Sequence, residues 1–433
     1  MFTELRLKNF KAWGSELWEH PCRLAPVTLF LGANSSGKTS LIQTLLLLKQ
    51  TFSSADRTLS LNLGGQENDL LDLGSFKDIV HNHDSKQEVA FGFTTSDRMG
   101  YRASFRAVGG VPTPMSLLLV NGEQQFSAQR QSKGGYLLTA PSYGPSHLTG
   151  RSAAKRPFAP ERSIVFPAEA VAELGQDGGR VQDLSLGLKL QMQHVAYLGP
   201  LREPPARTYQ WSGQTPGDLG DRGQFAALAL LASANTLKKQ TKNKEENRGW
   251  LVEKTSRWLK LLGIADSLEM VRQGRSRFFE VVVKTAGQRA NIVDVGFGVS
   301  QVLPLVVLAH FVPRGWTIIA EQPEIHLHPL VQAELADLMV EVSKERDVQF
   351  IVETHSEHLF RRMQFLIADG KTTPKDSALY FVEAKDNRAA LRELEIDEYG
   401  RVQNWPEKFF GDAIGETERQ MRRMVERMQQ GGE

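Results

Sequence analysis

The sequence predicts an α/β fold, and three apolar segments carry that prediction. Residues 27–31 read as a buried strand that runs into a glycine-rich loop, and a helix starts within this loop. Residues 316–320 and 348–352 read as two more short buried strands, and an acidic residue follows each of them. Because ligands bind outside the carboxyl ends of strands in open α/β sheets, we expect these strand ends to form one site.

A second group of strands is expected in the first half of the chain. Residues 89–93 and 102–107 look like pieces of an antiparallel sheet. The stretch 109–167 is rich in Gly, Pro and Ser and suits loops and short strands. No sustained heptads appear in the middle of the chain, which excludes a long coiled coil. The run 238–248 carries several lysines and reads as a solvated connector.

Length and composition predict a protein of the cytoplasm. With 433 residues the chain has enough length for a large core and two lobes. The single cysteine, Cys22, excludes a disulfide framework. The 52 basic and 50 acidic residues nearly balance, so the net charge gives no global attraction to nucleic acid or membranes. The apolar stretches are shorter than the roughly 20 residues that a membrane span needs, and no membrane contact is expected.

The glycine-rich loop matches the phosphate-binding pattern G-x-x-x-x-G-K-[ST] over residues 32–39. In this pattern the backbone N–H groups surround the phosphates, Lys38 reaches the β and γ oxygens, and the Thr39 hydroxyl binds Mg²⁺. The sequence therefore predicts a site for ATP and Mg²⁺. The residues expected to bind them are Gly32, Asn34, Ser35, Ser36, Gly37, Lys38, Thr39 and Ser40.

The acid after residues 316–320 is Glu321, which would hold Mg²⁺ through water together with Thr39. Glu353 caps the strand over residues 348–352 in the same way, and His355 follows it. Two neighbouring histidines, His326 and His328, are poor candidates for zinc ligands.

At this point the chain resembles the ABC-type ATPase heads of the SMC, Rad50 and RecF group, in particular the compact AAA15/AAA21 heads of bacterial anti-phage systems. The family pattern D-E-P-x-x-x-L-D places Glu321 at the metal-binding acid and Leu327-His328 at the D-loop. It places His355 at the histidine that senses the γ-phosphate. The resemblance implies a mixed central sheet, an antiparallel first lobe and a helical inserted lobe. The expected division is a composite core over 1–84 and 286–412, an inserted lobe over 85–285 and a C-terminal amphipathic helix over 413–433.

One departure from the family concerns catalysis. Gln322 stands where the family has the glutamate that polarises the attacking water, and an amide cannot act as a general base. Either hydrolysis is slow with Gln322 orienting the water, or Glu324 or His355 transfers the proton. The sequence therefore predicts an ATPase that acts as a switch, with Glu321, Gln322, Glu324 and His355 as catalytic candidates.

The segment 295–301 looks like a degenerate form of the family's signature loop, which completes the nucleotide site of a partner head. Gly296 aligns with the signature serine, so a γ-phosphate contact would come from Gly298 N–H, Ser300 or the helix N-terminus. This interpretation predicts a homodimer or larger homo-oligomer with ATP held between the heads. A plain glycine-rich turn before a buried helix is the alternative.

Two further motifs leave alternatives open. Arg202, at the end of Tyr197-Leu198-Gly199-Pro200-Leu201-Arg202, would pair with a phosphate or an acidic partner surface, or form a structural ion pair. The cluster His81-Asn82-His83-Asp84 suggests a nuclease by its letters, but adjacent side chains cannot converge on one metal ion.

The C-terminal residues 404–412 resemble the closing motif of the DUF3696 subgroup, with Trp405, Phe409 and Phe410 expected as core contacts. A helix is predicted from Glu416 onwards. Its apolar stripe consists of Met421, Met424, Val425 and Met428. The stripe would dock on the chain's own head, on a sister subunit or on an effector.

Together these features predict an ATP-binding regulator or sensor of a bacterial defence system. We expect it to control a separate effector, a nuclease, because relatives with their own nuclease append roughly a hundred residues and fewer follow Ser356 here. One alternative is a RecF- or Rad50-like repair ATPase that binds DNA directly. Another is a nucleotide-bound scaffold without turnover.

Overall fold

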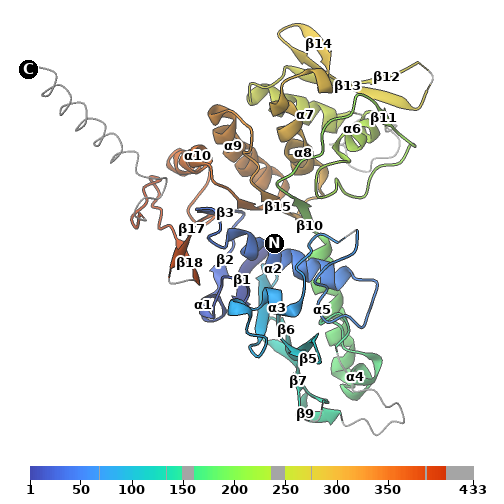
Figure 1. Ribbon diagram of the computed structural model, residues 1–433, viewed down its shortest axis with the longest axis vertical. Helices are drawn as coiled ribbons and strands as arrows, with labels where there is room; N and C mark the ends of the chain where they lie inside the picture. The colour runs from blue at the N-terminus through green and yellow to red at the C-terminus, as the bar shows by residue number, and fades with distance from the viewer. Residues whose placement is uncertain are drawn as a thin grey trace, which may run out of the picture.

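The computed structural model describes the chain except for residues 68, 133, 149–159, 236–248, 275, 386–387 and 406–433. The described residues form two lobes on either side of a six-stranded sheet (Figure 1). This arrangement of strands and helices confirms the predicted α/β class.

The central sheet has the order β10-β15-β16-β3-β17-β18. Its strands are β3 (Val27–Gly32), β10 (Val195–Leu198), β15 (Thr317–Glu321), β16 (Gln349–Glu353), β17 (Ser377–Lys385) and β18 (Arg388–Glu393). Neighbouring strands are parallel from β10 to β17, and only β18 pairs antiparallel. The sheet is therefore mixed, as the sequence predicts.

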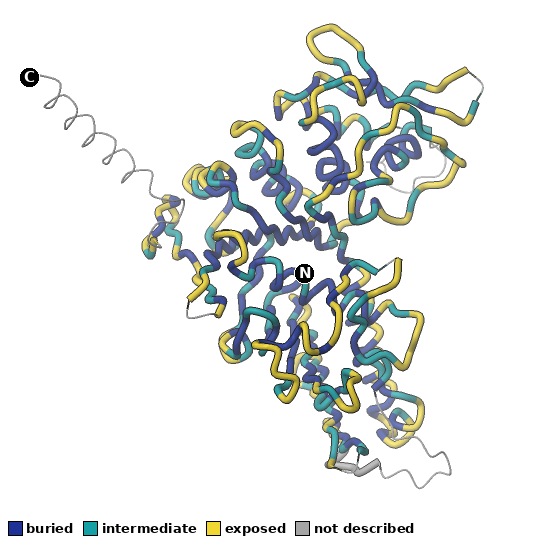
Figure 2. Tube along the Cα trace, in the orientation of Figure 1, coloured by how far each residue is buried: buried dark blue, intermediate teal, exposed yellow. Residues whose placement is uncertain are grey.

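Both faces of the central sheet are buried, which explains why its strands are continuously apolar. Successive side chains point to opposite faces, so Phe30 faces one hydrophobic cluster while Leu29 and Leu31 face another. Figure 2 shows the buried segments concentrated in this sheet and the helices beside it. The two clusters form the cores of the two lobes.

The first lobe is an antiparallel sheet with the order β2-β1-β4-β5-β6-β7-β8-β9, as predicted. Its strands are β1 (Phe2–Lys8), β2 (Cys22–Arg23), β4 (Val89–Thr95), β5 (Met99–Val108), β6 (Val111–Asn121), β7 (Gln124–Arg130), β8 (Tyr136–Ala140) and β9 (Tyr143–Leu148). Its helices are α1 (Glu16–Glu19), α2 (Lys38–Ser53), α3 (Phe76–Ile79), α4 (Ala168–Glu173) and α5 (Gln176–Gln193), with a 3₁₀ turn at His81–His83. The stretch 109–167 contributes strands β6 to β9, so it is more regular than its composition suggests.

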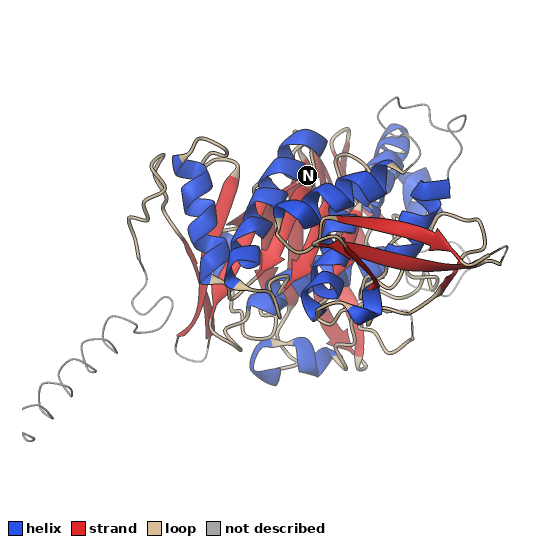
Figure 3. Ribbon diagram, turned by 90° about the horizontal axis from the view of Figure 1, so that it is seen from above, coloured by secondary structure: helices blue, strands red, loops and turns tan. Residues whose placement is uncertain are grey.

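The second lobe consists of five helices and a small sheet. The helices are α6 (Ala226–Asn235), α7 (Trp250–Leu261), α8 (Phe297–Phe311), α9 (Pro329–Arg346) and α10 (Glu357–Ala368). The strands are β11 (Tyr209–Gln210), β12 (Ser267–Arg272), β13 (Phe278–Thr285) and β14 (Gln288–Asn291), and a 3₁₀ turn follows at Ile292–Asp294. Figure 3 shows the helices lying over the central strands when the molecule is seen from above. Residues 85–285 are thus distributed over both lobes.

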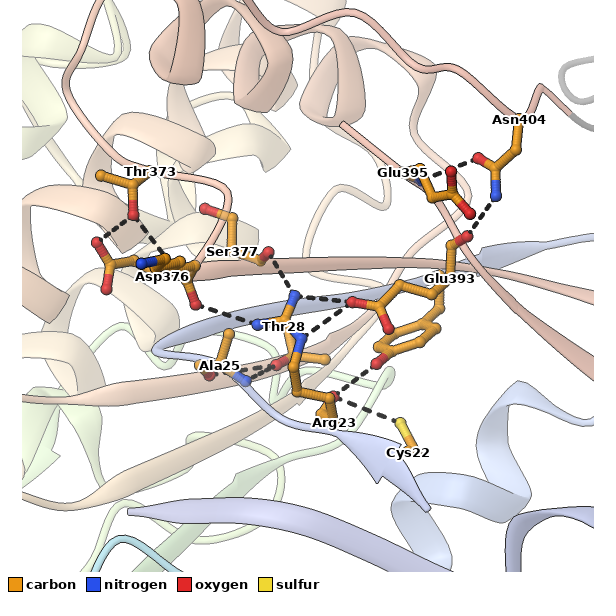
Figure 4. Close-up of polar contacts among 12 residues, drawn as sticks. Cys22, Arg23, Ala25, Thr28, Thr373, Asp376, Ser377, Glu393, Glu395 and Asn404 are labelled. Atoms are coloured by element: carbon orange, nitrogen blue, oxygen red, sulfur yellow. Dashed lines mark hydrogen bonds and ion pairs between the residues drawn. The ribbon is translucent and has the colours of Figure 1, made fainter. Parts of the chain in front are cut away.

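Arg23 of the first lobe forms hydrogen bonds with strands β17 and β18 of the central sheet (Figure 4). Its guanidinium donates hydrogen bonds to the Glu393 carboxylate and the Ser377 carbonyl, and its own carbonyl accepts one from the Tyr380 hydroxyl at 2.8 Å. Further along, the Trp405 ring lies edge-on to Phe360, with ring centroids 5.8 Å apart.

Several predicted features fall outside this description. Phe409, Phe410 and the predicted C-terminal helix lie outside the described residues, as does the whole charged run 238–248. Within the described part of the chain, no helix combines the length and the apolar character that a membrane crossing requires.

Candidate nucleotide-binding site

The phosphate-binding loop joins β3 to α2, the strand-loop-helix context that its pattern requires. Gly32 has φ +144°, and a Cβ there would lie 2.2 Å from the Val382 carbonyl oxygen. Gly37 has φ +106°, and its carbonyl accepts a hydrogen bond of 3.0 Å from the Trp13 indole. Only glycine fits both positions, because other residues rarely adopt these angles and have no room for a side chain.

Lys38 begins α2 and is buried within the loop. Its Nζ donates hydrogen bonds to the carbonyl oxygens of Gly32 at 3.1 Å and Ala33 at 2.7 Å. Burial lowers the pKa of Lys38, while the nearby carboxylates of Glu353 and Glu324 oppose that shift. The ammonium therefore sits inside the loop, where the helix N-terminus also favours an anion.

The other predicted loop ligands differ in exposure. Asn34 and Ser35 are exposed, and Ser35 has φ +59°. Ser36 and Ser40 are buried, and the Ser36 hydroxyl has no hydrogen-bond partner among the described residues. A buried hydroxyl without a partner is rare, so Ser36 has an unused donor and acceptor for a ligand in the loop.

Two carboxylates lie side by side where β15 and β16 end. The parallel register pairs Glu321 with Glu353, and β16 separates β15 from β3. The Thr39 hydroxyl donates to Glu353 Oε1 at 3.1 Å, and the Tyr197 hydroxyl donates to Glu321 Oε1 at 2.8 Å. The strand order thus brings both acids to the start of α2.

Thr39, Glu321 and Glu353 offer a hydroxyl and carboxylate oxygens, the hard donors that Mg²⁺ prefers. Glu353 Oε2 is buried and has no hydrogen-bond partner among the described residues. A buried carboxylate oxygen without a partner is costly, and a cation beside it would relieve that cost. These residues fit a magnesium ion, including the two that the sequence predicts.

The site concentrates negative charge. The pKa of Glu353 is raised to about 7, chiefly by burial and also by the carboxylates of Glu321 and Glu324, whereas the Thr39 hydrogen bond and the Lys38 ammonium oppose the shift. Burial also raises the pKa of Glu321 and of Glu324. Three buried carboxyl groups in one place destabilise their own charged forms, which is typical of functional sites.

The remaining catalytic candidates stand around these acids. The Gln322 backbone has φ +44° and donates its N–H to the Glu353 carbonyl at 2.7 Å. Glu324 is buried, and its Oε1 accepts the His355 backbone N–H at 2.6 Å. Burial and the Lys38 ammonium lower the pKa of His355, although a hydrogen bond with the Gly32 backbone opposes this. The structure therefore brings Gln322, Glu324 and His355 next to the phosphate loop.

The signature-like loop lies at the start of α8 on the second lobe. Gly296 caps this helix, and no atom of the described residues outside the immediate chain neighbours and the helix's own backbone lies within 4 Å of the position that a Cβ would occupy at Gly296 or Gly298. The Phe297 ring is exposed and meets His326 edge-on, with centroids 5.4 Å apart, just before the residues Leu327-His328 that are predicted as the D-loop. The Ser300 hydroxyl is buried and donates to the Phe297 carbonyl at 2.8 Å.

Sequence reasoning gave no role to two residues that the structure places at this site. Glu353 contacts the Thr39 hydroxyl, and Tyr197 contacts Glu321. The signal for Glu353 was present, since it caps an apolar strand as Glu321 does. The role of Tyr197 depends on the pairing of β10 with β15, which the sequence does not reveal.

Comparisons with solved structures find heads of SMC proteins. The SMC head domain from Thermotoga maritima is 14% identical with a TM-score of 0.42, and the match covers 91% of this chain and 99% of that chain. An SMC head bound to the C-terminal winged-helix domain of ScpA is 15% identical with a TM-score of 0.44, covering 92% and 98%. An SMC head with an extended coiled coil, bound to a ScpA domain derived from Pyrococcus furiosus, is 13% identical with a TM-score of 0.40, covering 91% and 96%. No curated protein sequence matches significantly.

Two family profiles match the chain. The profile described as an AAA domain, putative AbiEii toxin, type IV TA system, covers residues 27–361. A second, described as a protein of unknown function and designated DUF3696, covers residues 373–420. Both confirm the resemblances drawn from the sequence. Because the first profile spans well over half of its residues, this chain belongs to the AAA-domain family of the putative AbiEii toxins.

Proposed function

We propose that this protein is an ATP-dependent switch that binds ATP with Mg²⁺, hydrolyses it slowly and assembles in the ATP-bound form. The observation that supports this most is the convergence of Lys38, Thr39 and Glu353 at the start of α2. These groups belong to one buried site, and each has the chemistry that a triphosphate with its metal ion needs.

The chain's own residues perform separable tasks in this proposal. The loop N–H groups bind the phosphate oxygens, and Lys38 turns from the Gly32 and Ala33 carbonyls toward the β and γ oxygens. Thr39, Glu321 and Glu353 would hold Mg²⁺, which neutralises charge on the phosphates. Gln322 orients the attacking water without removing its proton, so turnover is slow.

Replacement of the lysine tests nucleotide binding directly. We expect Lys38→Ala to abolish measurable ATP binding by calorimetry, because it removes the only loop cation that reaches the β and γ oxygens. Lys344→Ala, on the exposed side of α9, is the matched control and should bind as the wild type does. Equal affinity of Lys38→Ala and the control would refute the assignment.

Assembly through ATP is supported by the exposed surface beside the site. Phe297, Leu330 and Leu201 are large apolar side chains that are 59%, 70% and 74% exposed. They belong to the signature-like loop, the start of α9 and the segment after β10, and the open glycines of α8 lie in the same lobe. In this proposal a second copy covers this surface and its signature loop completes the nucleotide site.

Control of a separate effector in bacterial defence is the finer part of the proposal. The family description, which names a putative AbiEii toxin of a type IV toxin–antitoxin system, supports such a setting. The effector, a nuclease, would be encoded beside this protein and would dock on the helix predicted after Gly415.

Deletion of the residues after Gly415 tests this docking. The neighbouring gene product should be lost in co-purification, while ATP binding and self-assembly persist. Retention of that product together with broken self-assembly would place the helix at the subunit interface.

A further inference from the structure

Arg202 is a buried cation that the proposed site does not yet use. It lies in the segment after β10, where the chain enters the second lobe. The residue is 8% exposed, and its Nη2 donates a long hydrogen bond of 3.4 Å to the backbone carbonyl of Glu321. Within the described part of the chain, its Nε and Nη1 are buried without any hydrogen-bond partner.

The charges near Arg202 leave its guanidinium incompletely compensated. The pKa of Arg202 is lowered to about 10 by burial, even though the nearby groups of Tyr197, Glu321 and Glu324 oppose that shift. Glu321 already accepts a hydrogen bond from Tyr197, and Glu324 accepts one from the His355 backbone. Among the described residues no carboxylate forms an ion pair with Arg202, and two of its nitrogen donors have no hydrogen-bond partner. A buried cation in this state is unfavourable unless an anion binds beside it.

Two other arginines of the same segment behave differently. Arg207 pairs with Asp294 through two hydrogen bonds of 2.8 and 2.7 Å. Arg222 forms an ion pair of 3.2 Å with Glu203. Both side chains are exposed to solvent and paired with a carboxylate. Arg202, in contrast, is buried near the acids of the candidate site, and two of its nitrogens have no partner among the described residues.

We propose that Arg202 binds the terminal phosphate of the nucleotide through a charge-assisted hydrogen bond from its guanidinium. This inference rests on the proposed ATP site. Glu324 is close enough to both Lys38 and Arg202 to raise the pKa of each, so both cations lie near this carboxylate. A guanidinium keeps its positive charge and donates charge-assisted hydrogen bonds to phosphate oxygens, so it is suited to this contact.

The position of Arg202 gives this contact a further consequence. Its segment is fixed to a turn of the second lobe, because Gly199 N–H donates to the Asp221 carbonyl at 2.7 Å and Glu203 N–H to the Arg222 carbonyl at 2.9 Å. Gly223 in that turn lies so close to Pro304 of α8 that a Cβ would be 2.4 Å from the proline ring. The same arginine that binds the terminal phosphate is therefore packed, through this turn, against the helix that carries the signature-like loop.

The test compares a triphosphate with a diphosphate by calorimetry in the presence of Mg²⁺. For Arg202→Gln we expect the Kd of ATPγS to rise about 10- to 100-fold, the range for a charge-assisted hydrogen bond, and that of ADP to change less than about twofold. Arg207→Gln, which removes an exposed arginine of the same segment, should leave both affinities unchanged. Equal weakening of both nucleotides, or no weakening of either, would overturn the proposal.

A second measurement separates binding from folding. Removal of an uncompensated buried cation should leave the melting temperature of the nucleotide-free protein unchanged or higher, so Arg202→Met should melt no earlier than the wild type. The additional stabilisation by ATPγS over ADP should be lost in this variant. Early melting without nucleotide would assign Arg202 to a structural role instead. Because ADP binding in the same variants reports on the ATP site itself, failure of the underlying site would be recognised separately.

Discussion

The phosphate loop and the signature-like loop are both glycine-rich segments before a helix, yet they differ in their surroundings. In the phosphate loop, Gly32 and Gly37 both have a positive φ, and a side chain at either position would collide with Val382 or Ala389. These two positions therefore require glycine. In the signature-like loop neither glycine has an atom within contact distance of its Cβ position. The first segment is shaped by its own chain, whereas the second has room for a partner.

The same contrast appears in the charges. Lys38, Glu321 and Glu353 are buried, and the pKa of Glu353 responds to both Lys38 and Glu321. At the start of α8 the neighbouring side chain is the exposed, apolar Phe297. The phosphate loop thus lies among charged groups suited to a metal ion and phosphates, whereas the start of α8 presents an exposed apolar side chain suited to association. The predictions below test each side of this contrast.

The largest expected effect is on hydrolysis. Gln322→Glu places a carboxylate where the resemblance predicts the general base, and we expect turnover to rise about 10²- to 10⁴-fold, the usual contribution of a general base. Steady-state ATPase assays measure this, with the remote and exposed Gln403→Glu as control. A wild type that is already fast, with no effect of Gln322→Glu, would assign the base to Glu324 or His355. The variant Glu324→Gln then separates those two.

The next effect concerns the open glycines. Gly298→Asp would bring a carboxylate toward the γ-phosphate of a partner's nucleotide, and like charges at about 4 Å repel by about 4 kcal/mol at an effective dielectric constant of about 20. Light scattering with ATP should show dimers or larger assemblies for the wild type and monomers for this variant. Gly179→Asp on α5, an equally open position, is the control. Identical masses for all three proteins would mean that the loop is a turn without a partner.

Stability of the nucleotide-free protein should depend on pH through Glu353. Its pKa is about 7 in the folded protein and near 4.3 when unfolded, so the native state binds more protons between these values. Stability therefore falls as pH rises through this window, by about 3 kcal/mol from this group. Urea unfolding with EDTA at pH 5 and pH 8 should show a smaller loss for Glu353→Gln, and the exposed Glu398→Gln should keep the wild-type loss. An unchanged loss in Glu353→Gln would mean that this carboxyl titrates normally.

The smallest effect on the monomer is expected at Phe297. Its ring is 59% exposed and its edge-on contact with His326 is worth about 1 kcal/mol, so Phe297→Ala should hardly change the unfolding free energy. If the ring belongs to the interface, ATP-driven association should weaken by more than about 1 kcal/mol. Phe365→Ala on α10, where the ring is 51% exposed, is the control. Equal association of both variants would remove Phe297 from the interface.

Much of the site could be predicted because its signals are local. The loop pattern fixes Lys38 and Thr39 at a helix start, and an apolar strand followed by an acid identifies Glu321. Both depend on a few consecutive residues and on backbone preferences that hold in any fold. The buried strands in the two halves of the sequence are likewise predicted from short runs of consecutive apolar residues.

The parts that the sequence left open depend on which strands become neighbours. Placing β16 between β15 and β3 sets Glu353 beside Thr39, and pairing β10 with β15 brings Tyr197 to Glu321. The pairing of β10 with β15 also brings Arg202 into a buried position, where two of its nitrogens have no hydrogen-bond partner among the described residues.

The sequence by itself identified the phosphate loop and its chemistry. It also identified the acid Glu321, which follows an apolar strand, and the family of the chain. Only the tertiary structure decided which of several acids meet the loop and which arginine is buried beside those acids. The physical reason is that pairing between strands far apart in the chain, together with the burial it causes, sets the distances and the dielectric environment of these charges.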